Sequence, residues 1–322
     1  MSEPNIPETV FDVVIVGGGP AGYTAGLYAA RASLKTLLIE GASPVSQITV
    51  TDWIENYPGM PEGASGFDVV DKFKKQAVQF GLQVVQADCN AIESREWNGV
   101  KGWAVLSGGK AFEALALIVA TGAHWRKLAV PGEEPYTGRG VSYCATCDGP
   151  FYRNRDVVVV GGGDTAVQEA LFLTHFCSKV TIVHRRDRLR ATAILQQRAF
   201  ANDKISFAWH AVVDEVMGEE TVTGVRLRDV RESGKTWILP ASGVFVFIGL
   251  IPNSELVAGQ VTLADDKAIV VDRDMRTSMP GIFACGDCTH KLLRQVVTAC
   301  GDGATAAFAA QLYVEDLKGN AY

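Results

Sequence analysis

The 322-residue chain lacks three features that would each indicate a particular class of protein. It has no basic excess, because 36 acidic residues outnumber 30 Lys and Arg to give a net charge of -6, and this disfavours nucleic-acid binding. Its apolar runs stop at glycines, far short of the roughly 20 residues that a membrane helix needs. Residues 1–10 contain no basic segment followed by an apolar one, so we expect no secretory signal, no membrane contact and a cytoplasmic location.

The cysteine content is unlike that of a small disulfide-rich secreted protein. Seven cysteines, an odd number in a chain of this length, predict that most thiols are reduced. The length predicts two domains, on a prior of roughly 100–200 residues per domain. A hydrophobic content of 48% with 33 glycines is typical of a globular α/β enzyme.

A glycine-rich turn follows the first apolar run. Residues 13–16 are typical of a buried parallel strand, Gly-Gly-Gly-Pro-Ala-Gly comes next, and a helical pattern continues through Arg31. This order predicts a dinucleotide site, because glycines permit a tight turn and bring backbone amides close to a pyrophosphate at the helix N-terminus. A second strand at 36–39 ends in an acid, about 20 residues on, where ribose hydroxyls are bound. The predicted contacts are Gly17, Gly19, Pro20, Ala21, Gly22 and Glu40.

The same order of elements recurs in the middle of the chain. An apolar run at 157–160 precedes Gly-Gly-Gly-Asp-Thr-Ala, a helix predicted through Phe176 and a strand at 180–183. Here a His-Arg-Arg run replaces the acid. An arginine cluster is often only a solvated surface, but guanidinium groups at this place can pair with a 2′-phosphate, so we favour NADPH over NADH. The predicted contacts are Gly161, Gly163, Asp164, Thr165, His184, Arg185, Arg186 and Arg190.

Two nucleotide units in one chain suggest that electrons pass from NADPH to a second dinucleotide, most economically FAD. Cys144 and Cys147 are two residues apart, a spacing that can close a redox disulfide. Two alternatives stay open: buried bystanders, or a zinc site completed by Cys285 and Cys288, which have the same spacing. We favour the redox interpretation. Asp148 is either the acid-base group of this chemistry or part of an ordinary Asp-Gly turn.

Together these motifs resemble low-molecular-weight thioredoxin reductases, and the resemblance covers nearly the whole chain. The matching stretches are 17–22, Glu-Asn-Tyr-Pro-Gly at 55–59, Ala-Thr-Gly-Ala at 120–123, the cysteine motif at 144–149, 161–166, 184–190, Gly-Ile-Phe-Ala-Cys-Gly-Asp at 281–287, and Arg294 with Gln295.

The resemblance implies an α/β fold of two Rossmann-like, three-layer dinucleotide-binding domains. Residues 1–121 and 250–322 would form a discontinuous FAD domain, and 122–249 an inserted NADPH domain that carries the Cys-x-x-Cys pair. Glycines near the two crossings, Gly122 and Gly249, would act as hinges for a rotation between half-reactions. The implied activity is electron transfer from NADPH through FAD and the dithiol to the disulfide of thioredoxin, in a homodimer without a metal.

The resemblance also assigns individual roles. Cys147 would be the sulfur nearest the flavin, Cys144 the one that attacks thioredoxin, and Asp148 the acid-base group. The residues implied to contact FAD are Gln47, Asn56, Ala120, Thr121, Gly122, Gly286, Asp287, Arg294 and Gln295.

The sequence departs from the family pattern at Val45 and Ser46, where two glycines are usual, so we expect a changed loop against FAD. Cys288 and Cys300 have no assigned role. The alternatives are a related flavin disulfide oxidoreductase with another donor or a small-molecule dithiol acceptor, and a zinc-stabilised nucleotide-binding regulator.

Overall fold

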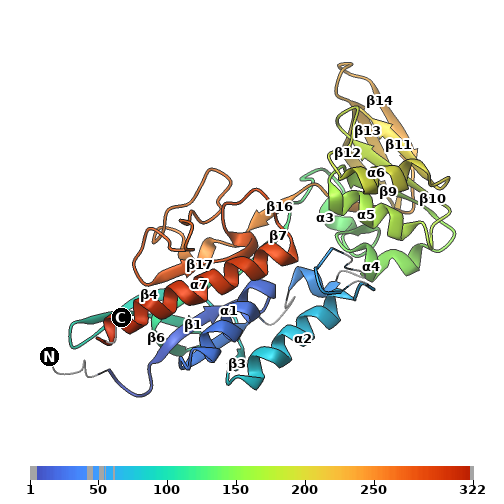
Figure 1. The fold of residues 1–322 in the computed structure, drawn as a ribbon. Coiled ribbons are helices and arrows are strands. Elements are labelled where there is room, and N and C mark those ends of the chain that lie inside the picture. The colour runs from blue at the N-terminus through green and yellow to red at the C-terminus, as the bar shows by residue number, and fades with distance from the viewer. Residues whose placement is uncertain (1–5, 42–45, 51–53, 55, 61, 320–322) are drawn as a thin grey trace. The chain divides into compact units, whose positions relative to one another are not determined.

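The computed structural model describes residues 6–41, 46–50, 54, 56–60 and 62–319 (Figure 1). The chain divides into two compact units, which are described separately. The first unit contains Met1–His124 and Ile251–Tyr322, and the second contains Trp125–Leu250. In the described part of the chain, no helix is both long enough and apolar enough to cross a lipid bilayer.

The first unit is built on a seven-stranded sheet whose centre is β1, with strand order β3-β2-β1-β6-β5-β4. The parallel strands are β1 (Phe11–Val16), β2 (Thr36–Glu40), β3 (Gln83–Gln86), β6 (Lys110–Val119) and β17 (Ile282–Ala284). The antiparallel strands are β4 (Ala91–Trp97) and β5 (Val100–Ser107). The long strand β6 pairs with β5 through its first half and with β17 through its second half.

The side chains of β1 alternate between two apolar cores, as the two-residue period of a strand requires. Val13 and Ile15 face the core that contains the helices, and Val14 and Val16 face the core on the opposite side of the sheet. The helices of the first core are α1 (Pro20–Arg31), α2 (Gly66–Gln79) and α7 (Val296–Leu317). Figure 1 shows α7, from the C-terminal end, beside α1, from the N-terminal end.

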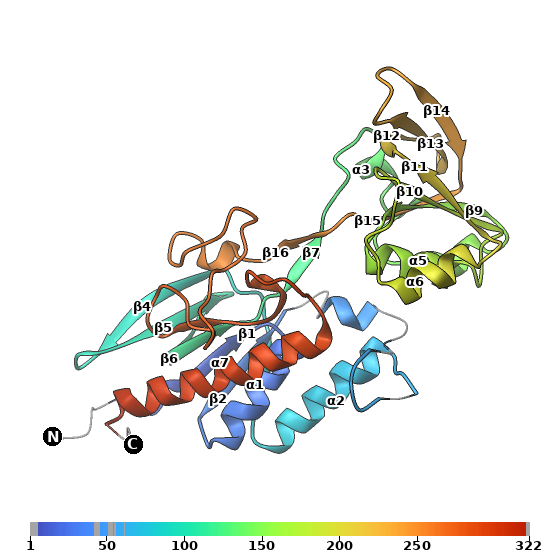
Figure 2. The ribbon, with the colours of Figure 1, turned by 45° about the horizontal axis from the view of Figure 1, so that its top comes forward.

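The second unit has three layers. Its centre is an all-parallel sheet with order β11-β10-β9-β15-β8, covered on one face by helices and on the other by an antiparallel sheet, β12-β13-β14 (Figure 2). The parallel strands are β8 (Val141–Ser142), β9 (Asp156–Gly161), β10 (Lys179–His184), β11 (Ile205–Trp209) and β15 (Gly243–Phe247). The antiparallel strands are β12 (Ala211–Gly218), β13 (Val222–Asp229) and β14 (Thr236–Pro240). The helices are α3 (Glu133–Tyr136), α4 (Ala145–Asp148), α5 (Asp164–Leu173) and α6 (Ala193–Phe200).

The helix after the second glycine turn is shorter than the sequence predicts. We expected it to continue through Phe176, but α5 ends at Leu173. The Thr174 hydroxyl donates to the Leu171 carbonyl oxygen at 2.6 Å, and the amides of Thr174 and Phe176 bond three residues back instead of four. The side chain of Thr174 therefore competes for a helical acceptor and the last turn tightens.

The two crossings between the units pair with each other. They contain β7 (Ala123–Trp125) and β16 (Leu250–Pro252), which form a two-stranded sheet. Beside it, the Asn253 side-chain amide donates to the Thr121 carbonyl oxygen at 2.9 Å, and the Thr121 hydroxyl donates to the Asn253 carbonyl oxygen at 2.5 Å. Thr121 and Gly122 are thus held at the start of the first crossing.

The contact between α1 and α7 generates a stability prediction. A Cβ on Gly303 would lie 2.2 Å from the Ala21 carbonyl oxygen, whereas a Cβ on Gly301, also in α7, would meet nothing within 4 Å. Gly303→Ala should lower the free energy of unfolding by about 1–3 kcal/mol through overpacking. Gly301→Ala should raise it by about 0.5–1 kcal/mol, because alanine favours the helix. Urea unfolding measures both, and equal effects would contradict the packing described.

Candidate functional site

The first glycine turn brings the end of β1 against the start of α1. Gly17 has φ +121°, and a Cβ on it would lie 2.2 Å from the Ala120 carbonyl oxygen. A Cβ on Gly22 would lie 1.9 Å from the Gly17 carbonyl oxygen. Only glycine fits at these two positions. Gly19 is the N-cap of α1 and provides no side-chain cap, and Pro20 has no N–H, so the backbone N–H groups of Ala21 and Gly22 have no acceptor within the helix and can bind an anion.

A cavity of about 390 Å³ adjoins this turn, within the range of small-molecule sites. Its walls come from the ends of neighbouring parallel strands and from the first crossing, and include Gly17, Gly41, Cys89, Thr121 and Asn253. Ligands bind at such carboxyl ends in open α/β sheets. The predicted residues Gly17 and Thr121 therefore share one cavity.

Glu40 ends β2 as expected and is buried, with 7% of its surface exposed. Its Oε2 accepts a hydrogen bond from Lys74 Nζ on α2 at 2.7 Å. No sequence motif predicts this lysine, because α2 lies in a separate stretch of chain. The carboxylate is thus held by a cation beside the turn.

Ser46 occupies the space next to Gly19. The Ser46 Oγ lies 3.3 Å from the place where a Cβ on Gly19 would be, and the Thr49 hydroxyl donates to the Ser46 carbonyl oxygen at 2.6 Å. Val45, the other departure from the family pattern, lies outside the described residues. Gln47 begins the short helix η1 (Gln47–Val50) and donates from Nε2 to the Ala123 carbonyl oxygen.

Asp287 has an unsatisfied buried oxygen. It lies in η4 (Gly286–Cys288), and its Oδ1 is buried with no hydrogen-bond partner among the described residues. Burial raises the pKa of the Asp287 carboxyl above its ordinary value, and the cations of Lys291 and Arg294 offset part of that rise. Such an oxygen is suited to accept a hydrogen bond from a bound molecule.

Three other predicted residues of this region make hydrogen bonds to Asp287 or to each other. Arg294 Nε donates to the Asp287 carbonyl oxygen at 3.2 Å. Asn56 Nδ2 donates to Gln295 Oε1 at 2.9 Å, so two residues 239 positions apart in sequence are in contact. Gln295 also caps α7.

The second glycine turn repeats the geometry of the first. Gly161 has φ +149°, and a Cβ on it would lie 2.3 Å from the Phe247 carbonyl oxygen. Gly163 is an N-cap without a side-chain cap, and Thr165 is exposed in the first turn of α5. Asp164 Oδ1 accepts from the Thr192 amide at 2.6 Å, so one carboxylate oxygen is occupied by the chain itself.

The His-Arg-Arg run separates into two environments. The side chains of Arg185, Arg186 and Arg190 are exposed at the end of β10, as phosphate binding requires. His184 is 6% exposed, its ring lies 2.5 Å from where a Cβ on Gly162 would be, and its Nε2 has no partner among the described residues. Burial, and then the nearby arginines, lower the pKa of His184. We conclude that His184 supports the turn as a neutral ring. Arg188, which sequence reasoning passed over, is exposed in the same run.

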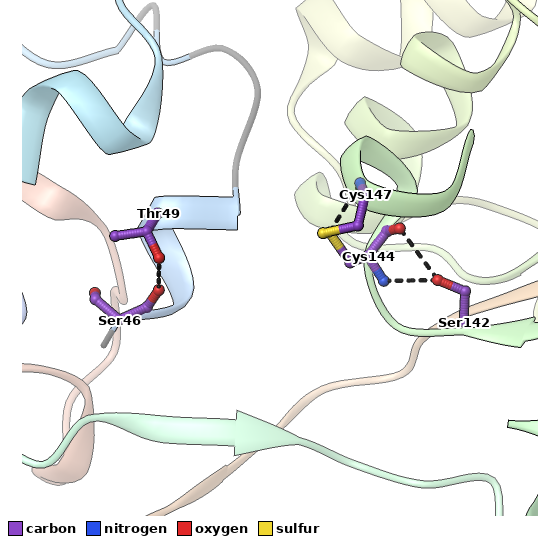
Figure 3. Close-up of a disulfide and its surroundings, with 5 residues drawn as sticks. All are labelled: Ser46, Thr49, Ser142, Cys144 and Cys147. Carbon is purple, nitrogen blue, oxygen red and sulfur yellow. Dashed lines mark hydrogen bonds between the residues drawn. A yellow bond between two sulfur atoms is a disulfide. The ribbon is translucent and has the colours of Figure 1, made fainter. Parts of the chain in front are cut away.

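Cys144 and Cys147 form a disulfide at the start of α4, with 5.4 Å between their Cα atoms (Figure 3). The Cys147 amide donates to Cys144 Sγ at 3.1 Å. The Cys144 amide donates to Ser142 Oγ at 3.0 Å, and that hydroxyl donates to the Cys144 carbonyl oxygen at 3.1 Å. Cys147 is exposed, whereas Cys144 is partly buried. Asp148, which follows Cys147, is also partly buried.

The zinc alternative finds no support in this geometry. A four-thiolate zinc site would need Cys144 and Cys147, which are joined in the disulfide. It would also need Cys285 and Cys288, which belong to the first unit. Cys285 and Cys288 are fully buried, and they face the apolar cores on opposite sides of the sheet. Among the residues that the structure describes, no group of three or more His, Cys, Asp or Glu is placed to hold a metal ion.

Residues 11–303 match the family model described as pyridine nucleotide-disulphide oxidoreductase. The chain belongs to this family. It is 47% identical to a thioredoxin reductase of Listeria monocytogenes over 97% of this chain and 96% of that protein. A crystal structure of Lactococcus lactis thioredoxin reductase matches with a TM-score of 0.91 and 43% identity, over 95% of this chain and 99% of that one. A crystal structure of T. acidophilum thioredoxin reductase matches with a TM-score of 0.85 and 32% identity, over 96% of this chain and 99% of that one.

These matches confirm the resemblance to low-molecular-weight thioredoxin reductases and the α/β fold with two Rossmann-like domains. Membership of the pyridine nucleotide-disulphide oxidoreductase family implies FAD and NAD(P)H. The residues fit both groups: each unit has a turn that excludes a Cβ, and the first unit adds the unpartnered oxygen of Asp287.

The buried carboxyl of Asp287 generates a pH prediction for the protein without a bound nucleotide. A carboxyl whose pKa is raised in the folded state binds its proton more tightly there than in the unfolded state. Its contribution to the free energy of unfolding therefore falls as pH rises from the pKa of the unfolded state, about 4, through that of the folded state. Asp287→Asn removes this loss. The variant should therefore gain stability relative to wild type as pH rises from acid to neutral, measured by thermal unfolding. The exposed Asp265→Asn is the control, and parallel curves for Asp287→Asn and wild type would refute the assignment.

Proposed function

We propose that the chain is an NADPH-dependent thioredoxin reductase, which passes electrons through FAD and the Cys144–Cys147 pair to the disulfide of thioredoxin. The observation that carries this proposal is the disulfide between Cys144 and the exposed Cys147 at the start of α4, in the same unit as the second glycine turn and the arginines. The relatives named as thioredoxin reductases support it, because they are similar over nearly the whole length.

The first unit would hold FAD. The turn from Gly17 to Gly22 would receive the pyrophosphate, Glu40 the adenosine ribose and Asp287 a hydroxyl of the ribityl region, with Arg294 and Gln295 nearer the flavin. The second unit would hold NADPH, with Gly161, Gly163 and Thr165 at the pyrophosphate and Arg185, Arg186 and Arg190 at the 2′-phosphate. Bound FAD would supply the two-electron carrier between nicotinamide and disulfide.

The two cysteines would divide the thiol chemistry. In the reduced protein, the Cys144 thiolate attacks one sulfur of the substrate disulfide, and the other substrate sulfur leaves with the electron pair. Cys147 then attacks Cys144 Sγ, which re-forms the 144–147 bond and releases the reduced substrate. The substrate thus gains two electrons and two protons. The Cys147 amide, 3.1 Å from Cys144 Sγ, favours the thiolate, and Asp148 would move the proton.

Three further parts of the proposal concern the whole molecule. Rotation about the crossings near Gly122 and Gly249 would alternate the two half-reactions, and both glycines have positive φ. Exposed apolar side chains on α7, such as Phe308 and Leu312, are consistent with a homodimer. A cytoplasmic location and the identity of the thioredoxin stay predictions.

Replacing the attacking thiol separates the two halves of the reaction. Cys144→Ser should abolish reduction of thioredoxin while NADPH still bleaches the flavin, because hydride delivery does not use the thiols. Stopped-flow absorbance of the flavin and a coupled thioredoxin assay measure the two steps. Cys177→Ala, a buried thiol of the same unit, should retain both. Thioredoxin turnover by Cys144→Ser would overturn the assignment.

The arginines should set the choice of donor. Arg185→Gln with Arg186→Gln should raise KM for NADPH by about tenfold or more for each lost charged hydrogen bond, and leave KM for NADH nearly unchanged. Arg228→Gln, whose guanidinium pairs with Asp214 at 3.0 Å, is the control. Equal effects on the two nucleotides would show that these arginines do not bind the 2′-phosphate. A wild-type protein that reacts with neither nucleotide would favour a different electron donor.

A further inference from the structure

A buried carboxylate in the second unit has no part in the reaction described above. Glu133 is the first residue of α3 and only 3% exposed. Its two oxygens accept three hydrogen bonds: Oε1 from the Leu128 amide at 2.6 Å and from the Tyr143 hydroxyl at 2.6 Å, and Oε2 from the Ala129 amide at 2.7 Å. A buried charge is tolerated only when donors surround it in this way.

One arm of this network holds the chain that leaves the first crossing. Leu128 and Ala129 come three and four residues after Trp125, the last residue of β7. Ala129 has φ +59°, a conformation that a residue with a Cβ adopts only when its surroundings impose it. The bond from its amide to Glu133, and that from the Val216 amide to the Pro131 carbonyl oxygen at 2.9 Å, supply the restraint.

The other arm holds the residue before the attacking cysteine. The Tyr143 ring packs against the apolar core between the parallel sheet and β12–β14. Burial and the Glu133 carboxylate raise the pKa of Tyr143, so its hydroxyl remains a donor throughout the physiological range. Tyr143 precedes Cys144 directly, and Ser142 bonds both backbone groups of Cys144 (Figure 3).

We propose that Glu133 is a positioning residue for Cys144. Acting through Tyr143, it fixes the backbone at 143–144 to the chain that follows the first crossing, and so keeps Cys144 Sγ opposite the Cys147 amide. The proposal rests on the proposed role of the Cys144 thiolate. It adds that the thiolate depends on a carboxylate eleven residues away in sequence, which acts through the Tyr143 hydroxyl.

The network makes a chemical prediction that differs from a loss of stability alone. An amide directed at sulfur favours the thiolate over the thiol. If the 143–144 backbone is released, the amide and Cys144 Sγ are aligned for less of the time. The thiolate then forms at higher pH, and alkylation of Cys144 below neutral pH slows, whether or not the protein melts at a lower temperature.

The test uses two variants, each of which removes or weakens one set of the hydrogen bonds of Glu133. Both are made in the full-length reduced protein with Cys147→Ser, so that Cys144 cannot re-form its disulfide. Tyr143→Phe removes the cysteine arm. Glu133→Gln presents an amide group to one of the N–H donors and loosens the arm to the crossing. The rate of Cys144 alkylation is followed across roughly pH 5 to pH 9 by peptide mass spectrometry, with thermal unfolding of the same samples.

Both variants should slow alkylation at the acid end by about three- to tenfold and move the pH profile to higher pH. The double variant should be no slower than the worse single one, because the two links act in series through Glu133 and breaking either one releases Cys144. Tyr136→Phe, the same chemical change on α3, should react as wild type does. Profiles within twofold of wild type, or additive effects, would overturn the proposal. If Glu133→Gln does not fold, Tyr143→Phe decides alone. This measurement needs no thioredoxin, so a failure of the proposed reductase activity would be seen separately.

Discussion

The molecule depends on backbone packing that leaves no room for a side chain. The Ala120 carbonyl oxygen lies against Gly17, and the Phe247 carbonyl oxygen against Gly161. This contact joins the end of β1 to β6 in the first unit and the end of β9 to β15 in the second, and it brings the next helix close enough for its unbonded amides to face a ligand.

The two turns differ in the groups that surround them, and these differences give the units separate tasks. The first unit offers a carboxylate at the end of β2 and the buried, unpartnered oxygen of Asp287. The second offers exposed guanidinium groups above a buried histidine whose pKa is lowered. Only the second unit contains a disulfide among the described residues. A neutral hydroxyl-rich group suits the first arrangement and an additional phosphate suits the second.

Local patterns in the sequence predicted much of this architecture. Runs of β-branched residues that end in glycine predicted β1 and β9 to within two residues, because buried parallel strands and tight turns each require particular residue types nearby. The predicted end of α5 was wrong, because the hydroxyl of Thr174 competes for a carbonyl oxygen of the helix. The antiparallel strands β12–β14 were not predicted.

Contacts between distant segments could not be foreseen in the same way. Lys74 at Glu40 and Asn56 at Gln295 join elements whose positions are set only by the complete fold. The partners of Glu133 are nearer in sequence, but no motif connects it to Leu128, Ala129 and Tyr143. The burial of His184, in a run that suggested a charged surface, also follows from tertiary packing against Gly162.

The proposed enzyme passes electrons in order from a nicotinamide, through a flavin, to a sulfur pair. Anaerobic titration of the purified wild-type protein tests it most directly. NADPH should bleach the yellow flavin absorbance, NADH should do so much less effectively, and oxidised thioredoxin added afterwards should restore the colour. A colourless protein that cannot take up FAD, or a reduced flavin that thioredoxin leaves unchanged, would contradict the account.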